Sequence, residues 1–146
     1  MKRFLIAIAL SIAASFVVVG NQPQLAQGLS LAPETTPAYA VLVLRKAAVE
    51  AELARVSELL TSDHPSVGSK RFELHAINVE MKKMLAVKPS GAAKLSSSVG
   101  NLILSKVALE VELTELSRSY TADYPEIKQR RVELAALERE IEKILR

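Results

Sequence analysis

The chain of 146 residues contains no cysteine and no tryptophan, and only 4% of its residues are aromatic. Without cysteine there is no disulfide framework, no thiol nucleophile, no thiolate metal site and no lipid-bearing cysteine. So few aromatic side chains give no platform on which nucleic-acid bases could stack. Charge of one sign is also lacking, because 19 basic side chains stand against 16 acidic ones and two of the basic ones are Lys2 and Arg3. We therefore expect no nucleic-acid partner.

The first residues have the pattern of an export signal. Lys2 and Arg3 precede an apolar run over 4–19, and small residues suited to cleavage follow at Gly20 and Gly28. A basic start followed by a short apolar run is typical of a secretory signal rather than of a buried core helix. We therefore expect a periplasmic or secreted protein.

The N-terminal part divides into a signal peptide at 1–28 and a spacer at 29–36. The spacer is rich in Pro, Gly, Ser and Thr and has no hydrophobic period, which is typical of a flexible segment. An alternative stays open, in which residues 4–20 remain as an anchor in the inner membrane. A spanning helix needs about 20 apolar residues, so the run is slightly short for that role.

The rest of the chain is a repeat with a period of 60 residues. Aligning 42–85 with 102–145 without gaps gives 18 identities in 44 positions, and TSDHPSVGSKRFEL at 61–74 corresponds to TADYPEIKQRRVEL at 121–134. Each copy has apolar residues at alternating spacings of three and four on both sides of its proline, as coiled-coil helices do. A helical hairpin repeated in this way cannot bury its apolar surface alone.

We predict an all-α fold of two tandem antiparallel coiled-coil hairpins, packed together as a four-helix bundle. The first hairpin spans 37–87, a linker spans 88–97 and the second hairpin spans 98–146. The predicted helices lie near 37–61, 65–87, 98–121 and 125–146. The pair Thr36-Pro37 favours a helix start, with a capping hydroxyl followed by proline at the first helical position.

Each hairpin turn is predicted to be a device that ends one helix and starts the next. Proline has no N–H and clashes with a preceding helical turn. An aspartate two residues earlier can accept a hydrogen bond from an unpaired N–H of the new helix. The residues assigned to these turns are Thr61, Asp63 and Pro65 in the first copy and Thr121, Asp123 and Pro125 in the second.

Two further features concern how the helices pair. Folding each hairpin at its turn is expected to bring Lys46 beside Glu80 and Lys106 beside Glu140, as register-setting pairs within each hairpin. A second apolar stripe runs beside the first, and packing one hairpin on the other would bury it. The alternative, in which the stripe faces a partner chain, stays open. Its members are Leu44, Ala47, Ala48, Ala51, Phe72, Ala76 and Val79, and in the second copy Leu104, Val107, Ala108, Val111, Val132, Ala135 and Ala136.

Few residues have the pattern of a chemical site. His64 and His75 are the only histidines, neither recurs in the second copy, and neither has enough neighbours at ligand spacing for a metal. Ser96, Ser97 and Ser98 lie in the linker without a base nearby, so helix capping is the better interpretation. We predict no catalytic, cofactor or metal site, and expect that the protein is not an enzyme.

Charged residues recur between the copies outside the coiled-coil seam. Charges on a helix face are usually a solvated surface. A face that is present twice could instead present the same contact twice and so bind with higher avidity. The candidate interaction face comprises Glu50, Glu52, Arg71 and Glu73 in the first copy and Glu110, Glu112, Arg131 and Glu133 in the second.

The turn sequences resemble the periplasmic coiled-coil segment of polysaccharide co-polymerases, the chain-length determinant proteins of exopolysaccharide export. The resemblance spans about fifteen residues in each copy. Its residues are Leu116, Tyr120 to Ile127, Arg131, Leu134 and Leu137, with Thr61 to Val67 in the first copy. The sequence departs from that family in lacking a second membrane helix, a flanking mixed domain and a kinase motif.

The leader, the repeated hairpin and the lack of a catalytic constellation predict an exported, non-catalytic helical interaction or scaffold protein of the cell envelope. The resemblance implies a link to polysaccharide export. Its partner would be another protein or a second copy of the chain, bound through helix faces. Contact with a membrane would be made only by an uncleaved N-terminal segment. The alternative is a small periplasmic helical chaperone or stress sensor.

The leader gives a direct prediction. N-terminal sequencing of the protein from the envelope fraction should find a first residue between 21 and 29. An intact Met1 in the membrane pellet would show the anchor instead, and a cytosolic protein would contradict both.

Overall fold

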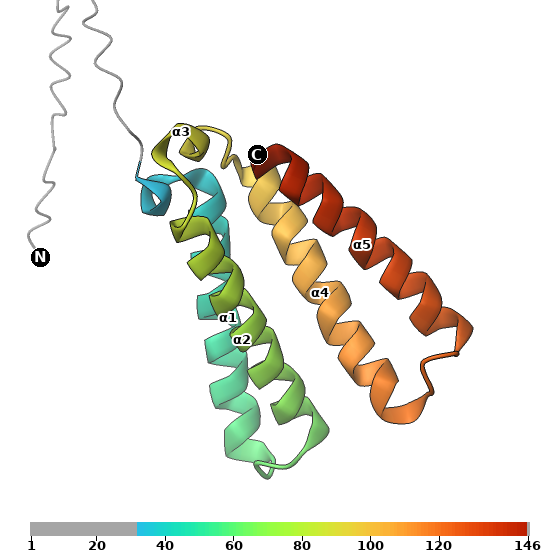
Figure 1. The fold of residues 1–146 in the computed structure, drawn as a ribbon. Coiled ribbons are helices and arrows are strands. Elements are labelled where there is room, and N and C mark those ends of the chain that lie inside the picture. Colours follow the sequence, from blue (N-terminus) through green and yellow to red (C-terminus); the bar gives the residue numbers. More distant parts are fainter. Residues whose placement is uncertain (1–31, 146) are drawn as a thin grey trace, which may run out of the picture.

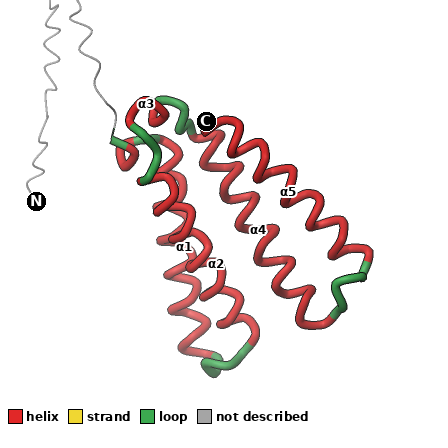
Figure 2. Tube along the Cα trace, in the orientation of Figure 1, coloured by secondary structure: helices red, strands yellow, loops and turns green. Residues whose placement is uncertain are grey.

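A computed structural model describes residues 32–145, and every regular element in that range is helical. The long helices are α1 (Pro37–Leu59), α2 (Pro65–Leu85), α4 (Ser97–Ser119) and α5 (Pro125–Leu145). Two short elements accompany them, the 3-10 helix η1 (Pro33–Thr35) and α3 (Pro89–Ala92) in the linker. The helices form two antiparallel hairpins whose turns lie at one end of the molecule (Figures 1 and 2). The predicted all-α fold of two packed hairpins is confirmed.

The first helix starts where the sequence predicted. The Thr36 hydroxyl oxygen accepts a hydrogen bond from the N–H of Tyr39 at 3.3 Å and donates one to the carbonyl of Pro33 at 2.7 Å. Thr36 is buried, so both bonds are protected from water. Pro37 follows as the first helical residue. The N–H at this position has no partner within a helix, so its absence in proline costs no hydrogen bond.

The two turns share one backbone geometry. The N–H of His64 donates to the carbonyl of Thr61 at 3.0 Å, and the N–H of Tyr124 donates to the carbonyl of Thr121 at the same distance. Helices α2 and α5 then begin at the prolines that follow. The threonines thus take part through their backbones.

The predicted aspartate cap differs from the structure. At α2 the capping residue is His64, whose Nδ1 accepts a hydrogen bond from the N–H of Ser66 at 3.2 Å. The Asp63 carboxylate accepts from the Ser62 hydroxyl instead. The reason is that proline forces the residue directly before it into the extended conformation of a cap, which leaves Asp63 one position too early.

The hairpins pack through an inner helix. Helix α4 contacts both α1 and α2 of the first hairpin, whereas the extensive contacts of α5 within the described residues are with α4 alone. In Figure 1, α4 accordingly lies between the first hairpin and α5. The main core lies in this joint, toward the end of the molecule opposite the turns. Its buried members are Ala38, Leu42, Val49, Ala76, Ile77, Met84, Leu95, Val99, Ile103, Val107 and Ile141.

The second apolar stripe is buried only where it faces this joint. Ala76 on α2 and Val107 on α4 are buried. Other members of the stripe on α1 and α5 face solvent. Leu44 on α1 is 72% exposed, and Val132 on α5 is 66% exposed. Hairpin packing therefore covers only the part of the stripe that lies in the joint. One inner helix covers the first hairpin, and nothing among the described residues covers the outer faces.

Gly100 allows the closest approach between the hairpins. A Cβ atom at this position would lie 2.9 Å from the carbonyl oxygen of Ala38 and 3.0 Å from both the Cα of Ala38 and the Cβ of Val41. These are rigid parts of α1, so α4 could not stay at this distance with a larger residue. The N–H of Ala38 also donates to the carbonyl of Leu95 at 3.1 Å, which ties the start of α1 to the segment before α4.

This close approach gives a prediction for two glycines. Gly100→Ala should lower the free energy of unfolding by about 1–3 kcal/mol, because overpacking outweighs the better helix propensity of alanine. Gly68→Ala is the matched control, since its Cβ would meet only the flexible end of Arg118 at 3.4 Å. That variant should be neutral or up to about 1 kcal/mol more stable. Urea unfolding decides, and an equal response of both variants would contradict the tight joint.

Candidate interaction surface

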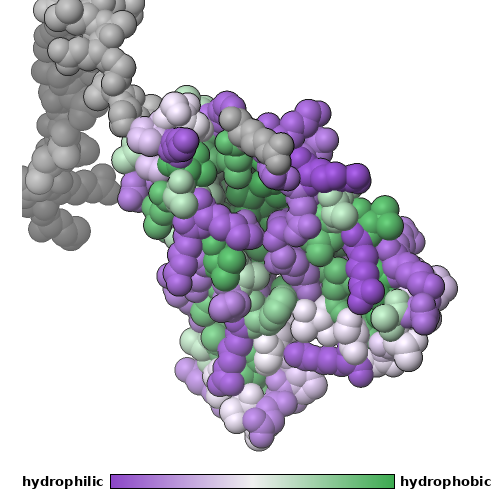
Figure 3. Space-filling model, viewed as in Figure 1, coloured by the Kyte–Doolittle hydropathy of each residue, from purple (hydrophilic) through white to green (hydrophobic). Residues whose placement is uncertain are grey.

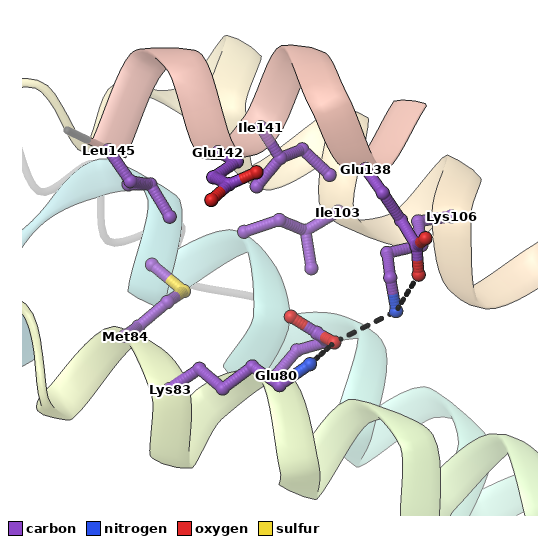
Figure 4. A pocket seen from close by; sticks show the side chains of 9 residues that line it. All are labelled: Glu80, Lys83, Met84, Ile103, Lys106, Glu138, Ile141, Glu142 and Leu145. Carbon is purple, nitrogen blue, oxygen red and sulfur yellow. Dashed lines mark hydrogen bonds and ion pairs between the residues drawn. The ribbon is translucent and has the colours of Figure 1, made fainter. Parts of the chain in front are cut away.

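A buried ion network joins the two hairpins. Lys106 on α4 is only 6% exposed, and its Nζ donates to a carboxylate oxygen of Glu80 on α2 at 3.0 Å. It also donates to Glu110 one turn further along α4. Lys83 donates to the same oxygen of Glu80 at 2.7 Å (Figure 4). Four charges of alternating sign therefore lie in series across the joint.

The register pairs predicted within each hairpin are wrong. Glu80 binds Lys106 of the other hairpin rather than Lys46, and Lys46 pairs with Glu50 on its own helix at 3.7 Å. Glu140 lies exposed beside Lys143, at 3.9 Å between their charged atoms. The reason is that α4 docks across α2, so the lysine of the second copy points out of its own hairpin and into the joint.

The surroundings favour the charged forms of this pair. Burial by itself would raise the pKa of Glu80, but the hydrogen bonds from Lys83 and Lys106 outweigh it and hold the pKa below its usual range. Burial would likewise lower the pKa of Lys106, and the hydrogen bonds from Glu110 and Glu80 raise it instead. Glu80 and Lys106 therefore both stay ionised near neutral pH.

A groove of about 420 Å³ lies beside this network, between α2 and α5. Met84, Ile103, Ile141 and Leu145 line it with apolar atoms, and the charged network borders it (Figure 4). It exists because α5 packs on α4 and does not close onto α2. The groove has no set of groups arranged for catalysis, and Glu138 reaches into it mainly toward Lys106, at 3.9 Å.

Part of the predicted charged face serves to join helices within each hairpin. Lys70 contacts Glu52 on α1 and Glu73 on its own helix, the latter at 3.1 Å. Arg45 adds a further contact to Glu73. These residues bridge α1 and α2 beside the seam.

The second hairpin repeats this cluster. Arg130 contacts Glu112 on α4 at 3.2 Å and Glu133 on its own helix at 2.9 Å. The duplicated glutamates thus have the same function twice, which is to hold the two helices of a hairpin together. The copies differ in the central cation, which is Lys70 in one and Arg130 in the other, and in Arg45, whose repeat equivalent is Ser105.

The remaining members of that face do not form one surface. Glu50 and Glu110 pair with the lysines of their own helices. Arg71 and Arg131 are exposed, and neither forms an ion pair with another residue of the described range 32–145. The eight predicted residues therefore divide into intrahelical pairs, interhelical clusters and two solvated arginines.

The turn tips differ in chemistry between the copies. Tyr120 and Tyr124 stack in the second turn, with ring centroids 4.2 Å apart. In the first turn the corresponding residues are Leu60 and His64, and His64 caps α2. Residues 32–145 contain no group of three or more potential metal ligands. The histidines are accounted for by capping at His64 and by exposure at His75.

The part of the predicted second apolar stripe that lies on α1 is an exposed apolar face. Val43 and Leu44 are 42% and 72% exposed, and Ala47, Ala48 and Ala51 are exposed beside them. Figure 3 shows apolar surface interspersed with polar side chains along the hairpins. This face has smaller side chains than its equivalent on α4, where Val107 and Val111 stand in place of Ala47 and Ala51.

No family model matches the chain, and neither a curated protein nor a solved structure matches it. Within 32–145 no helix has the length and apolar character needed to cross a membrane. The residues of the predicted leader lie outside the described range.

The ion network predicts a dependence of stability on pH. A carboxylate whose pKa is lowered in the folded protein stabilises the fold above its unfolded pKa, and this contribution is lost as pH falls through the folded pKa. The free energy of unfolding should therefore fall as the pH drops below about 4.5, the ordinary glutamate value. Glu80→Gln should remove part of this dependence and cost about 1–3 kcal/mol at pH 7.

Glu58→Gln is the control, because Glu58 is exposed on α1 and lies outside the buried network. Urea unfolding at pH 7 and at pH 3.5 measures both effects. The same loss in the two variants would contradict a special contribution from the buried network.

Proposed function

We propose that the protein is an exported, non-catalytic interaction or scaffold protein of the cell envelope that binds its partner through helix faces. The observation that supports this most directly is the apolar face of α1. Its central residue, Leu44, is 72% exposed, while its repeat equivalent Leu104 packs against the core. A face that binds helices in one copy and stays open in the other favours an interaction role.

The charged face is a weaker basis for binding. Its glutamates are occupied in ion pairs, and exposed ion pairs add about 0–1 kcal/mol each. Arg71 and Arg131 are the members left for a partner, and they are solvated. The apolar face of α1 therefore supplies more of the expected binding energy, through burial of carbon atoms.

The location is proposed from the sequence. Lys2, Arg3 and the apolar run at 4–19 favour export, and the resemblance of both turns to polysaccharide co-polymerase segments favours a place beside polysaccharide export. The folded part then presents its helix faces outside the cytoplasm.

A crosslinking experiment tests the interaction role. A photoreactive residue is placed at Ala48, next to Leu44, and the protein is crosslinked in intact envelope. We expect discrete adducts, identified by mass spectrometry, and their loss in a chain that also has Leu44→Glu. An Arg71→Glu and Arg131→Glu double variant should keep the adducts.

The outcomes separate the two faces. Adducts that survive Leu44→Glu but disappear in the arginine variant would show that the charged face binds. Absence of any adduct at Ala48, with the protein folded by circular dichroism, would contradict the interaction role of α1.

A further inference from the structure

Two surfaces meet in the joint between the hairpins. Each of them has a repeat equivalent elsewhere in the chain, and the chain leaves that equivalent open. On α4, the residues that enter the joint include Ile103, Lys106 and Val107, which are 0%, 6% and 1% exposed. Their equivalents sixty residues earlier are Val43, Lys46 and Ala47 on α1, and all three are more exposed. The first hairpin thus presents, on α1, a copy of the face by which the second hairpin binds to it.

The receiving side of the joint also has an open copy. In the first hairpin, Leu42, Val49, Ala76, Ile77, Glu80 and Met84 are all buried, and they lie where α4 packs on α1 and α2. Their equivalents in the second hairpin are Leu102, Leu109, Ala136, Leu137, Glu140 and Ile144. Every one of these keeps the same chemical character, and every one is half-buried or exposed. Leu102 and Ile144 also pack against the existing core, so the open part of this surface is formed by Leu109, Ala136, Leu137 and Glu140. The second hairpin therefore presents a copy of the surface that received it.

The charges match in the same way. The buried network is made of two halves, Lys106 with Glu110 on α4 and Glu80 with Lys83 on α2. Both halves are present again on the open surfaces, as the pair Lys46 and Glu50 on α1 and the pair Glu140 and Lys143 on α5. Within the chain these two pairs are on different hairpins and do not meet. They would meet only if α1 of one molecule docked on the second hairpin of another.

We propose that the partner of this protein is a second copy of itself, bound head to tail through a repetition of the joint between its own hairpins. In this complex Lys46 of one molecule pairs with Glu140 of the next, as Lys106 pairs with Glu80 within the chain. The proposal rests on the interaction role proposed above and names the partner.

The geometry of this contact determines what kind of assembly forms. The two surfaces are different, so each molecule that binds leaves one surface of each kind free. A head-to-tail contact of this type produces a ring if the rotation closes and an open filament if it does not. Stacking of hairpins through nearest-neighbour joints is the general behaviour of helical repeats.

Two positions make the joint between molecules differ from the joint within the chain. The equivalent of Gly100 is Ala40, so a methyl group occupies the place of closest approach. The equivalent of Val41 on the receiving side is Asn101, which is polar and exposed. Both changes lie near the helix starts, away from the charge network. The contact between molecules is therefore expected to be weaker than the internal joint and to depend on concentration.

Site-directed crosslinking tests the contact, because the chain has no cysteine and any thiol is an introduced one. The protein is isolated from the envelope with its native N terminus. Two single variants, Ala47→Cys and Ala136→Cys, are mixed and treated with a short thiol-reactive crosslinker. We expect dimers that link residue 47 to residue 136. A mixture of Ala47→Cys with Ala122→Cys, at the exposed second turn, should give none.

Charge exchange tests the pairing. Lys46→Glu and Glu140→Lys should each weaken self-association about tenfold or more, because like charges would meet in the contact. The double variant with both changes should associate within a few-fold of the original protein. Arg131→Glu makes the same change in net charge as Lys46→Glu, but on an exposed residue outside both surfaces. This variant should have little effect on self-association. Sedimentation over a range of concentrations gives the dissociation constants.

Contrary outcomes are distinct. A crosslink that joins residue 47 of one molecule to residue 47 of another would overturn the head-to-tail contact. So would a double variant that associates as weakly as the two single variants. A purified protein that stays monomeric at every concentration, while adducts at Ala48 with another protein still depend on Leu44, would overturn self-association and leave the proposed interaction role standing. Loss of both self-association and adducts in the original protein would contradict both proposals.

Discussion

An antiparallel pair of amphipathic helices has more apolar surface than its own seam can cover, and this constraint determines the rest of the structure. In the first hairpin the excess lies between α1 and α2, and α4 covers it. Gly100 brings α4 close enough for contact with the backbone of α1. Lys106 can then be buried against Glu80, where an unpaired charge would be strongly destabilising. The second hairpin has the same excess, and no third hairpin covers it within the described residues.

The repeat explains why charges recur. The clusters around Lys70 and Arg130 hold the two helices of each hairpin together, so their duplication follows from the duplication of the hairpin. The network around Lys106 has a different origin. Its lysine belongs to the second copy and its glutamate to the first. The repeat equivalents of these two residues, Lys46 and Glu140, are present but lie outside the joint. Recurrence of a residue between copies therefore has two physical meanings, which depend on whether its partner lies within the hairpin or beyond it.

An assembly built on this plan would be regulated by geometry and charge rather than by a ligand. The internal joint tolerates no side chain at position 100, whereas the equivalent surface has a methyl group at Ala40. In the proposed assembly, a small difference of this kind would separate a permanent contact within one chain from a reversible one between chains, because close-packed interfaces are sensitive to single methyl groups. The leader predicted at 1–28 and the proposed place in the envelope set where such an assembly would form.

The sequence by itself determined the hairpins. The spacing of apolar residues, Thr36-Pro37 and the prolines of the two turns specify helix type, boundaries and direction through local sterics and hydrogen bonding. It did not determine which hairpin each lysine would face. Lys46 and Lys106 occupy equivalent positions in the repeat, yet one is half-buried beside Glu50 and the other is buried against Glu80. Only tertiary packing separates them, because the docking of α4 across α2 breaks the symmetry that the repeat creates.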